Sequence, residues 1–275
     1  MPREFADSYV YPGSQVLKNI PGFKNEQTLK IFEYEQSAIR SAELARKPHS
    51  QKFDLQHLQA LHKHLFQDVY AWAGEIRTVN LRKNSTLFAQ PAFIQSYTGK
   101  ICRDLAAERH LKNQPKTVFV GRLSYYFTEL NAVHPFREGN GRSTRIFIGD
   151  IARDAGYVLD QCQIDNSQNQ WNDASARAHA GDPVPLTAIF HAAIRPERAI
   201  AFEADDPPVA IKKFPELSEA FASLRAADAY ATSIVDPRAR TGFLAQTRHL
   251  IQTALDEGKS VPATQIGVRK HGPVR

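Results

Sequence analysis

Helical spacing of apolar residues is the feature of this sequence that most constrains its fold. Over most of the chain, hydrophobic side chains recur every three to four residues, which is the period of one face of an α-helix. The pattern predicts helices over 25–47, 54–70, 91–111, 115–132, 142–156, 166–180, 186–194, 216–230 and 241–257. Pro48 ends the first of them because proline lacks the backbone N–H that a helix interior needs. The chain is therefore expected to be mainly helical.

One segment breaks the helical pattern. Between Glu75 and Gln90 the sequence is rich in β-branched and apolar residues on either side of a polar tip, Lys83-Asn84-Ser85. Two short runs of such residues around a polar tip are typical of a β-hairpin. The sequence therefore predicts a mainly α fold with one hairpin. For Lys83 and Asn84 the alternative is an ordinary surface turn without a ligand.

Proline and glycine mark the expected divisions of the chain. Both recur in residues 1–22, which we expect to be irregular. The pair Pro207-Pro208 follows two aspartates and is the best candidate for a linker. We therefore expect three parts, namely an irregular segment over 1–22, a core domain over 23–205, and a C-terminal helical extension with a basic tail over 206–275.

The composition suits a folded protein inside a cell. Of the 275 residues, 42% are hydrophobic, which is enough to bury the core of a large domain. No apolar run approaches the ~20 residues that a membrane span needs, and the first residues lack the basic-then-apolar pattern of a signal peptide. Two cysteines are too few for a disulfide scaffold. We expect a cytoplasmic protein without a membrane partner.

Three weaker signals do not point to a function. The net charge is +6, and a basic balance can reflect a polyanionic partner, a nucleotide or solubility. The basic tail is most simply a solvated segment, so we expect no nucleic-acid partner. His57, His62 and His64 cluster without the His-Glu-x-x-His spacing of a zinc site, and we interpret them as solvated helix positions.

The chemically informative stretch is His-Pro-Phe-Arg-Glu-Gly-Asn-Gly-Arg-Ser-Thr-Arg, residues 134–145. Gly139 and Gly141 permit backbone conformations in which successive N–H groups converge on an anion. The helix that follows presents its positive N-terminal end to the same place. Arg142 and Arg145 are three residues apart, so both can grip phosphate oxygens from one helix face. Glycines before a helix are weak evidence alone, but together with these charges they predict a phosphate site.

Two further side chains in this stretch suit transfer chemistry. Glu138 can supply an oxygen ligand to Mg²⁺, which usually binds one or two carboxylates together with substrate phosphates. His134 offers a base that titrates near neutral pH. Phe136 stands between polar neighbours and fits a core anchor for the loop. The set fits transfer onto or from a nucleotide phosphate.

At this point the sequence resembles a known family. Residues 134–145 match, position by position, the Fic-domain motif His-x-Phe-x-(Asp/Glu)-Gly-Asn-Gly-Arg-x-x-Arg. The segment AWAGEIRTVN at 71–80 is similar to the usual lead-in to the hairpin of that family, and the likeness extends over roughly residues 20–200. The resemblance implies a Fic-type helical bundle with a hairpin flap. It also implies an enzyme that transfers AMP from ATP to a Ser, Thr or Tyr hydroxyl of a target protein and releases pyrophosphate.

The resemblance also implies a role for each residue of the motif. His134 would be the general base that deprotonates the target hydroxyl, and Glu138 would hold the Mg²⁺ that bridges the α- and β-phosphates. The loop residues would form an anion hole, and the two arginines would contact the β- and γ-phosphates. These nucleotide-binding residues are Gly139, Asn140, Gly141, Arg142 and Arg145.

The hairpin over residues 76–90 would be the family's flap, which pairs with an extended piece of the target as an added strand. Lys83 and Asn84 at its tip would cover the nucleotide. The phosphotransferase branch of the family replaces the first glycine of the loop and its last positions. Here the loop is intact, which favours AMP transfer over phosphorylation, although the motif alone leaves other nucleotides and phosphocholine transfer open.

Regulation is a further expectation from the resemblance. Many such proteins are restrained by a helix with the pattern (Ser/Thr)-x-x-x-Glu-(Gly/Asn), whose Glu pairs with the second arginine of the motif. Residues 253–258 fit that pattern, with Glu257 as the inhibitory residue, and a helix end capped by Gly258 is the alternative. If Glu257 is not the inhibitor, a small antitoxin protein is the expected partner, as in toxin-like systems.

Two classes of function follow. The first is a bacterial toxin- or effector-like adenylyltransferase, which is either cytoplasmic or secreted into a host cell without a cleavable signal. The second is a nucleotide-binding regulatory module on the same core with weak or lost transfer, and a phosphotransferase is a further alternative.

Overall fold

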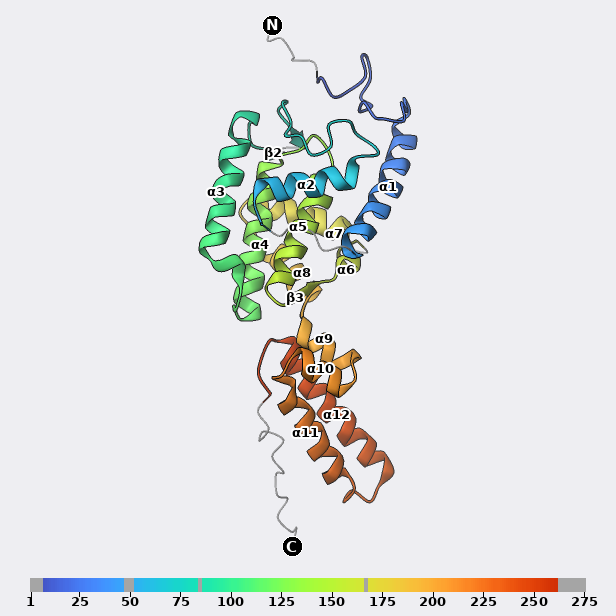
Figure 1. Cartoon of the computed structure of the whole chain (residues 1–275), viewed down its shortest axis with the longest axis vertical. Helices are drawn as coiled ribbons and strands as arrows, with labels where there is room; N and C mark the ends of the chain where they lie inside the picture. Colours follow the sequence, from blue (N-terminus) through green and yellow to red (C-terminus); the bar gives the residue numbers. More distant parts are fainter. Residues whose placement is uncertain (1–6, 47–51, 84–85, 166–167, 262–275) are drawn as a thin grey trace.

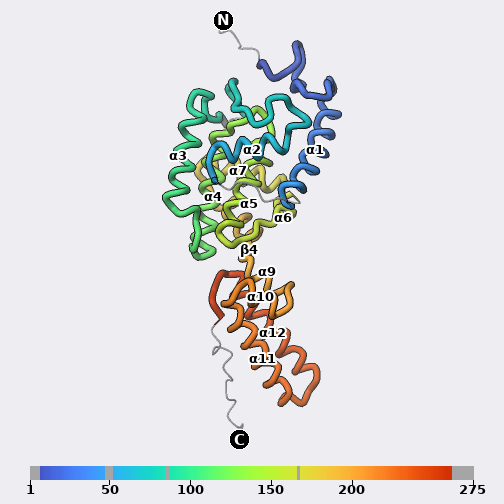
Figure 2. Tube along the Cα trace, viewed as in Figure 1, coloured from blue at the N-terminus to red at the C-terminus, as the bar shows by residue number. Residues whose placement is uncertain are grey.

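A computed structural model describes the protein over residues 7–46, 52–83, 86–165 and 168–261. Helices dominate these residues, so the mainly α fold is confirmed. Figures 1 and 2 show a larger upper body that holds the N-terminal part of the chain and a smaller lower body, which meet at a narrow waist.

The upper body is built from helices that follow the predicted ranges, apart from the five-residue helix Gln161–Asp165, which no predicted range covers. They are α1 (Glu26–Arg46), α2 (Leu55–Phe66), α3 (Ile94–Ala107), α4 (Lys116–Val133), α5 (Asn140–Asp154), α6 (Gln161–Asp165), α7 (Gln168–His179) and α8 (Val184–Ala193). Single 3₁₀ turns, Pro91–Phe93 and Arg109–Leu111, flank α3. The predicted helix over 91–111 is therefore divided, because Arg109–Leu111 adopts left-handed backbone conformations that no glycine or proline announces.

The centre of the upper body is α4, which contacts α3, α5, α7 and α8. Phe119, Leu123, Phe127 and Leu130 of this helix are at most 2% exposed and belong to the main hydrophobic cluster. Side chains at this spacing cover more than one helix face, so α4 is held on several sides. Its C-terminal end is thereby fixed in place, and that end leads into residues 134–145.

The predicted hairpin is confirmed in a shorter form. Strands β1 (Arg82–Lys83) and β2 (Thr86–Leu87) are antiparallel, with Arg82 opposite Leu87 and Lys83 opposite Thr86. Asn84 at the tip lies outside the described residues.

A second antiparallel pair was not predicted from the sequence. It joins β3 (Tyr157–Leu159) to β4 (Ile194–Pro196). Each strand has three residues and their pairing is long-range, which leaves no local alternation in the sequence.

The lower body is a separate helical unit with its own core. It contains α9 (Glu197–Ala204), α10 (Pro207–Lys213), α11 (Leu217–Ala231) and α12 (Pro237–Asp256). Its core is a second hydrophobic cluster that includes Ala199, Phe202, Leu217, Phe221, Ile251 and Leu255.

The division between the two bodies differs from the expected boundary at 205/206. Because Phe202 is fully buried in the second cluster, α9 packs with the lower body. Pro207 and Pro208 do not form a linker but begin α10, with Asp206 at its N-cap. Proline fits the first helical turn, where its missing N–H would have no partner within the helix.

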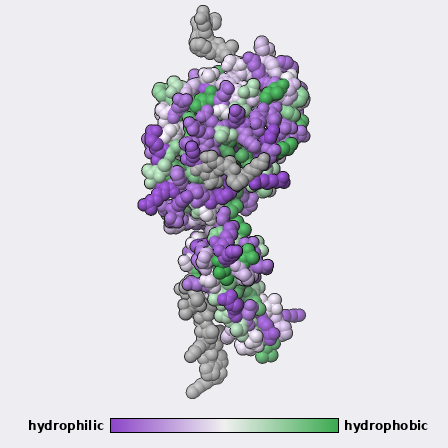
Figure 3. Space-filling model, in the orientation of Figure 1, coloured by the Kyte–Doolittle hydropathy of each residue, from purple (hydrophilic) through white to green (hydrophobic). Residues whose placement is uncertain are grey.

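Polar contacts fasten the two bodies together at the waist. The N–H of Glu197 donates to the carbonyl of Gly156 at 2.9 Å, and Arg195 forms an ion pair with Asp256 at 2.8 Å. Within the lower body, Arg198 of α9 donates to the carbonyl of Gly258 at 2.6 Å, which holds the end of α12 beside this junction. Figure 3 shows hydrophilic side chains over much of the upper body, with hydrophobic ones visible at the waist. Among the described residues, no helix is both long and apolar enough to span a membrane.

Candidate functional site

The candidate site lies where the C-terminal end of α4 meets the N-terminal end of α5. Residues 134–139 form the connection, and Gly139 is the N-cap of α5 with a φ of 79°. A Cβ built on Gly139 would collide with the ring of Phe66. Only glycine suits this position, both for its backbone conformation and for the space available. The first N–H groups of the helix point out of this turn and suit an anion.

Asn140 braces the loop rather than facing outward. Its side-chain oxygen accepts from the N–H of Phe136 at 2.8 Å, and its amide nitrogen donates to the carbonyl of Phe136 at 2.7 Å. Phe136 itself is fully buried, as expected for a core anchor. Since the side chain of Asn140 is engaged in this way, only its backbone N–H could take the anion-hole role that the family resemblance implies.

His134 follows α4 directly and has a left-handed backbone with φ 50°. Its Nδ1 lies 3.2 Å from the carbonyl oxygen of Asn131, and its ring stacks on Phe88 at a centroid distance of 3.8 Å. A carbonyl oxygen only accepts, so Nδ1 carries the proton and Nε2 keeps its lone pair. Burial lowers the pKa of His134 to about 4, against the hydrogen bond to Asn131 that raises it. The imidazole is therefore neutral at pH 7 and able to act as a base.

Glu138 is exposed at the tip of the loop. One carboxylate oxygen accepts from the N–H of Gly139 at 2.9 Å, which places the carboxylate beside the start of α5. A Mg²⁺ ion bound through one carboxylate and substrate phosphates needs no larger cluster of protein ligands. Glu138 fits that requirement.

The two arginines of the motif leave α5 in different directions. Arg142 forms an ion pair with Glu33 of α1 and donates to the hydroxyl of Ser37 at 2.9 Å. Arg145 forms an ion pair with Asp165 of α6 at 2.8 Å, and burial lowers its pKa. Both guanidinium groups are thus held by carboxylates from helices that flank α5.

The surroundings of the loop include a histidine that was wrongly expected to be solvated. His62 is fully buried and stacks on Phe136 at 3.9 Å, and His57 is also buried. The Nδ1 of His62 accepts from the N–H of Gly74 at 2.9 Å, so its Nε2 donates to the carbonyl of Glu138 at 2.8 Å. Burial lowers the pKa of His62 to about 4. Polar partners, which a periodicity argument does not consider, allow this ring to be buried.

Arg77 is a second residue that sequence reasoning did not single out. It lies in the segment before the hairpin and is 1% exposed. Its guanidinium donates to several backbone carbonyls, among them that of His134 at 2.8 Å. The resemblance of residues 71–80 to the family was the only sequence feature that included Arg77. A single arginine forms no spacing pattern with other charged residues, so nothing in the sequence singled it out.

Two other predicted residues differ in how close they lie to the site. Lys83 is near enough that its charge contributes to lowering the pKa of His134. Glu257 forms an ion pair with Lys259 at the end of α12, and the adjacent Gly258 lies against Lys116. Lys116 begins α4 and His134 follows its end, so a helix of 18 residues separates them, roughly 25 Å. The structure does not bring Glu257 to Arg145.

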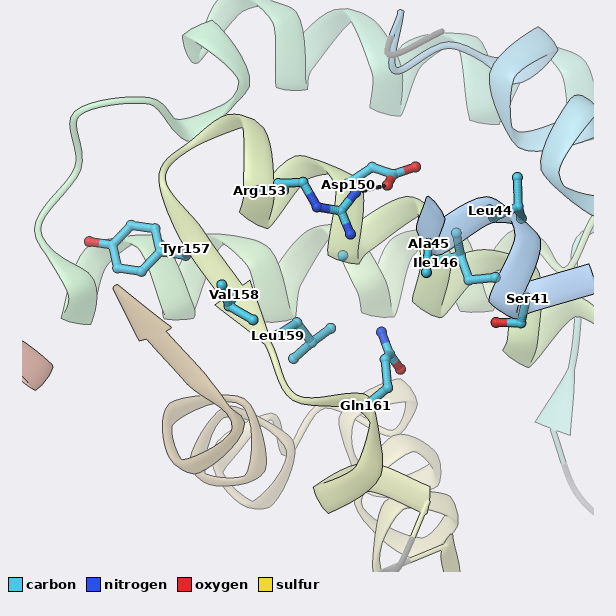
Figure 4. Close-up of a pocket in the computed structure, with 11 residues that line it drawn as sticks. Ser41, Leu44, Ala45, Ile146, Asp150, Arg153, Tyr157, Val158, Leu159 and Gln161 are labelled. Atoms are coloured by element: carbon cyan, nitrogen blue, oxygen red, sulfur yellow. Dashed lines mark hydrogen bonds and ion pairs between the residues drawn. The ribbon is translucent and has the colours of Figure 1, made fainter. Parts of the chain in front are cut away.

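A cavity of about 130 Å³ lies between α1, the second half of α5 and β3 (Figure 4). Its walls include Leu44, Ile146, Leu159 and the ion pair of Asp150 with Arg153. Of the described residues that line it, none belongs to 134–145. We therefore treat it as separate from the candidate site.

Comparison with known proteins gives the site a context. The model of the Fic/DOC family matches residues 52–151. The protein adenylyltransferase VbhT of Bartonella schoenbuchensis is 41% identical over 184 residues, which cover 67% of this chain and 38% of that protein. A probable protein adenylyltransferase Fic of Escherichia coli is 35% identical over 187 residues, which cover 68% of this chain and 92% of that protein.

Solved structures agree with the fold. The BepC effector of Bartonella tribocorum, crystallised with bound AMPPNP, superposes with a TM-score of 0.65 at 25% identity. The match covers 68% of this chain and 96% of that one. This chain thus spans nearly all of BepC as crystallised but less than half of VbhT.

Proposed function

Because this chain belongs to the Fic/DOC family, we propose that it is a protein adenylyltransferase, which transfers AMP from ATP to a hydroxyl side chain of a target protein. The observation that carries the proposal is the juxtaposition of a neutral His134 with the start of α5 on one short loop. A base and an anion site so close together suit attack of a hydroxyl on a phosphate. As in its relatives, the activity is that of a nucleotidyltransferase.

The reaction proceeds by positioning and by charge stabilisation. The N–H groups at the start of α5 bind phosphate oxygens, and Arg142 and Arg145 bind those farther along the triphosphate. The Nε2 atom of His134 takes the proton of the target hydroxyl. At the same time the hydroxyl oxygen bonds to the α-phosphorus. The bond from the α-phosphorus to the bridging oxygen breaks, and pyrophosphate leaves. When bound at Glu138, Mg²⁺ supplies positive charge to the phosphates.

The target protein docks on the hairpin of β1 and β2, as an added strand along residues 76–90. Leu87 supports this proposal, because it is 63% exposed at the edge of a two-stranded sheet. Phe88, the next residue, stacks on His134, so a strand seated here lies close to the base. Lys83, exposed beside the tip, covers the nucleotide, and we assign the same role to Asn84.

Restraint of the enzyme falls to a separate small antitoxin protein. The exposed face of α1 offers it apolar side chains, since Ile31 and Tyr34 are 52% and 72% exposed. The opposite face of the same helix carries Glu33, which pairs with Arg142. A protein bound along α1 therefore lies close to the phosphate-binding end of α5.

Internal restraint through Glu257 is the alternative to a separate antitoxin, and it has a direct test. Because Glu257 lies at the other end of α4 from His134, we expect Glu257→Gly to auto-modify at the wild-type rate, within about twofold. Incorporation of α-labelled ATP into the purified protein measures the rate. An acceleration of tenfold or more would instead identify Glu257 as the brake.

The function itself is tested with labelled nucleotides. Incubation with α-labelled ATP and Mg²⁺ should label the protein or a lysate protein, and His134→Ala should lower the rate by about 10²- to 10⁴-fold. Label from the γ-position on the target would indicate a phosphotransferase. Retention of ATP without any transfer would indicate a nucleotide-binding regulatory module. Mass spectrometry of the labelled band identifies the modified residue.

A further inference from the structure

Arg77 has an unusual environment for a charged residue. It is 1% exposed, and its guanidinium donates to four backbone carbonyls. Nη1 binds Val79 at 2.6 Å, and Nη2 binds Ala89 at 2.6 Å and Val133 at 3.2 Å. Nε binds His134 at 2.8 Å. Burying a charge is costly unless its donors are satisfied, so these contacts explain how it is tolerated.

The four carbonyls belong to two structures that must cooperate in the reaction. Val79 precedes β1 and Ala89 follows β2, so two of the contacts hold both ends of the hairpin. Val133 and His134 close α4, where helix carbonyls lack partners within the helix and where a cation is favoured. The backbone N–H of Arg77 adds a bond to the carbonyl of Pro135 at 2.9 Å.

We infer that Arg77 is a positioning residue that fixes the base of the hairpin to the backbone of His134, so that a target seated on the hairpin is in register with the imidazole. This inference rests on the proposed function. The hydrogen bond to the His134 carbonyl holds a residue that is left-handed without being glycine. Phe88 forms a second link, since it follows β2 and stacks on the imidazole with an interplanar angle of 15°.

The shape of the side chain explains why an arginine is present. A guanidinium is a planar fork with donors on three nitrogens, which can reach carbonyls from two directions at once. The ammonium of lysine keeps the charge but has its donors on one atom, so it cannot reproduce four contacts. Arg77→Lys therefore removes the geometry and keeps the charge, whereas Arg77→Gln removes both.

The two variants differ in their expected effect on the pKa of His134. Among the groups that face His134, the positive charges of Arg77 and of Lys83 from β1 lower its pKa, as does His179 from α7. Replacing Arg77 with a neutral residue should therefore move the acid limb of the rate profile to higher pH. Arg77→Lys should leave that limb where it is. The shift of this limb therefore reports the position of the charge, whereas the kcat of Arg77→Lys reports the geometry of its hydrogen bonds.

The experiment compares wild type, Arg77→Lys and Arg77→Gln, with Arg122→Lys as the control. Arg122 is another arginine with several donors in use, to Glu108 and Tyr126, and its hydrogen bonds to described residues do not reach the hairpin. Rates of AMP transfer give kcat and KM for the target, titration gives the ATP affinity, and thermal unfolding shows which variants are folded. The imidazole of His134 is titrated by NMR.

We expect Arg77→Lys to lower kcat by about 10- to 100-fold, because small misplacements of reacting groups have effects of that size. The Kd for ATP with Mg²⁺ should stay within about twofold, since no contact of Arg77 reaches α5. Arg122→Lys should keep the wild-type kcat. An unchanged kcat in folded Arg77→Lys would overturn the inference, as would a loss of ATP binding in parallel with kcat.

Two further readouts keep the inference testable. If Arg77→Lys does not fold, Phe88→Leu is measured instead, and an unchanged kcat there refutes the link between hairpin and base. If the wild type does not transfer AMP at all, the proposed function fails. The NMR titration then still decides the placement of the Arg77 charge, because the pKa of His134 should shift with Arg77→Gln and not with Arg122→Gln, which removes a charge elsewhere.

Discussion

Two imidazoles beside the loop, those of His62 and His134, are kept neutral by burial, and each uses that state differently. His134 donates from Nδ1 and so keeps the lone pair of Nε2, which the proposed role as a base requires. His62 accepts at Nδ1 and donates from Nε2, which ties Gly74 to the carbonyl of Glu138. A protonated His62 would have no acceptor for Gly74. The neutral state is needed for the hydrogen bonds of His62, and for His134 it is needed by the proposed role as a base.

The lowered pKa of His62 predicts that the protein loses stability in acid. The pKa is about 4 in the folded protein against 6.5 for an unperturbed imidazole, so the unfolded chain binds the extra proton first as the pH falls. The contribution is fully present above pH 6.5 and is lost between pH 6.5 and pH 4, by up to about 3 kcal/mol. Urea unfolding at several pH values should show His62→Ala with a lower stability at pH 7 but a shallower fall.

Two glycines of the loop offer a matched pair of substitutions. Gly139→Ala combines a left-handed φ of 79° with a collision against Phe66, so it should cost about 1–3 kcal/mol and weaken ATP binding. A Cβ on Gly141 meets nothing within 4 Å in a helical position. Gly141→Ala should therefore leave thermal stability equal or higher, by up to about 1 kcal/mol. Equal melting temperatures for the two variants would contradict this account.

At the scale of elements, α1 contributes to the site through one carboxylate. Glu33 is largely buried, pairs with Arg142 and accepts from the hydroxyl of Tyr70. Neither spacing nor motif relates it to Arg142, which lies 109 residues later. Only the packing of α1 beside the start of α5 reveals the contact.

Glu33→Gln should destabilise the protein by about 1–3 kcal/mol, because it removes the charge that a half-buried guanidinium faces. The control is Glu26→Gln on the same helix. Glu26 pairs with Lys30 at the surface, where both side chains are more than 60% exposed, and a pair so open to solvent contributes little to stability. Chemical denaturation compares the two variants, and equal losses would show that burial of Glu33 does not matter.

The elements also show what a sequence can and cannot reveal. The longer helices were predictable because each buries an apolar face of its own, as α4 does with Phe119, Leu123 and Phe127. The short helices α6, α9 and α10 were not predicted, because five to eight residues show too little of the helical period. The motif was predictable because one loop holds most of its residues. Arg77 and Glu33 were not, since their partners lie far along the chain. The pair β3–β4 was missed for the same reason.

At the scale of the whole molecule, α9 decides where the protein can be divided. Phe202 is fully buried in the second cluster, so a chain that ends at residue 205 keeps α9 but exposes this face. That exposure costs roughly 1.5–3 kcal/mol for the one aromatic side chain. We expect truncation after Pro196 to leave a more soluble upper body than truncation after Asp205. Size-exclusion chromatography of the two fragments checks this, and greater aggregation of the shorter fragment would count against it.

The placement of the lower body at the far end of α4 has a consequence for how the enzyme meets its surroundings. One end of this helix carries His134, the base of the proposed reaction, and the other end, at Lys116, touches the lower unit. The two ends of α4 are far apart, so the lower unit does not cover the loop between α4 and α5. A partner that binds the lower unit would therefore leave the candidate site accessible to a target protein.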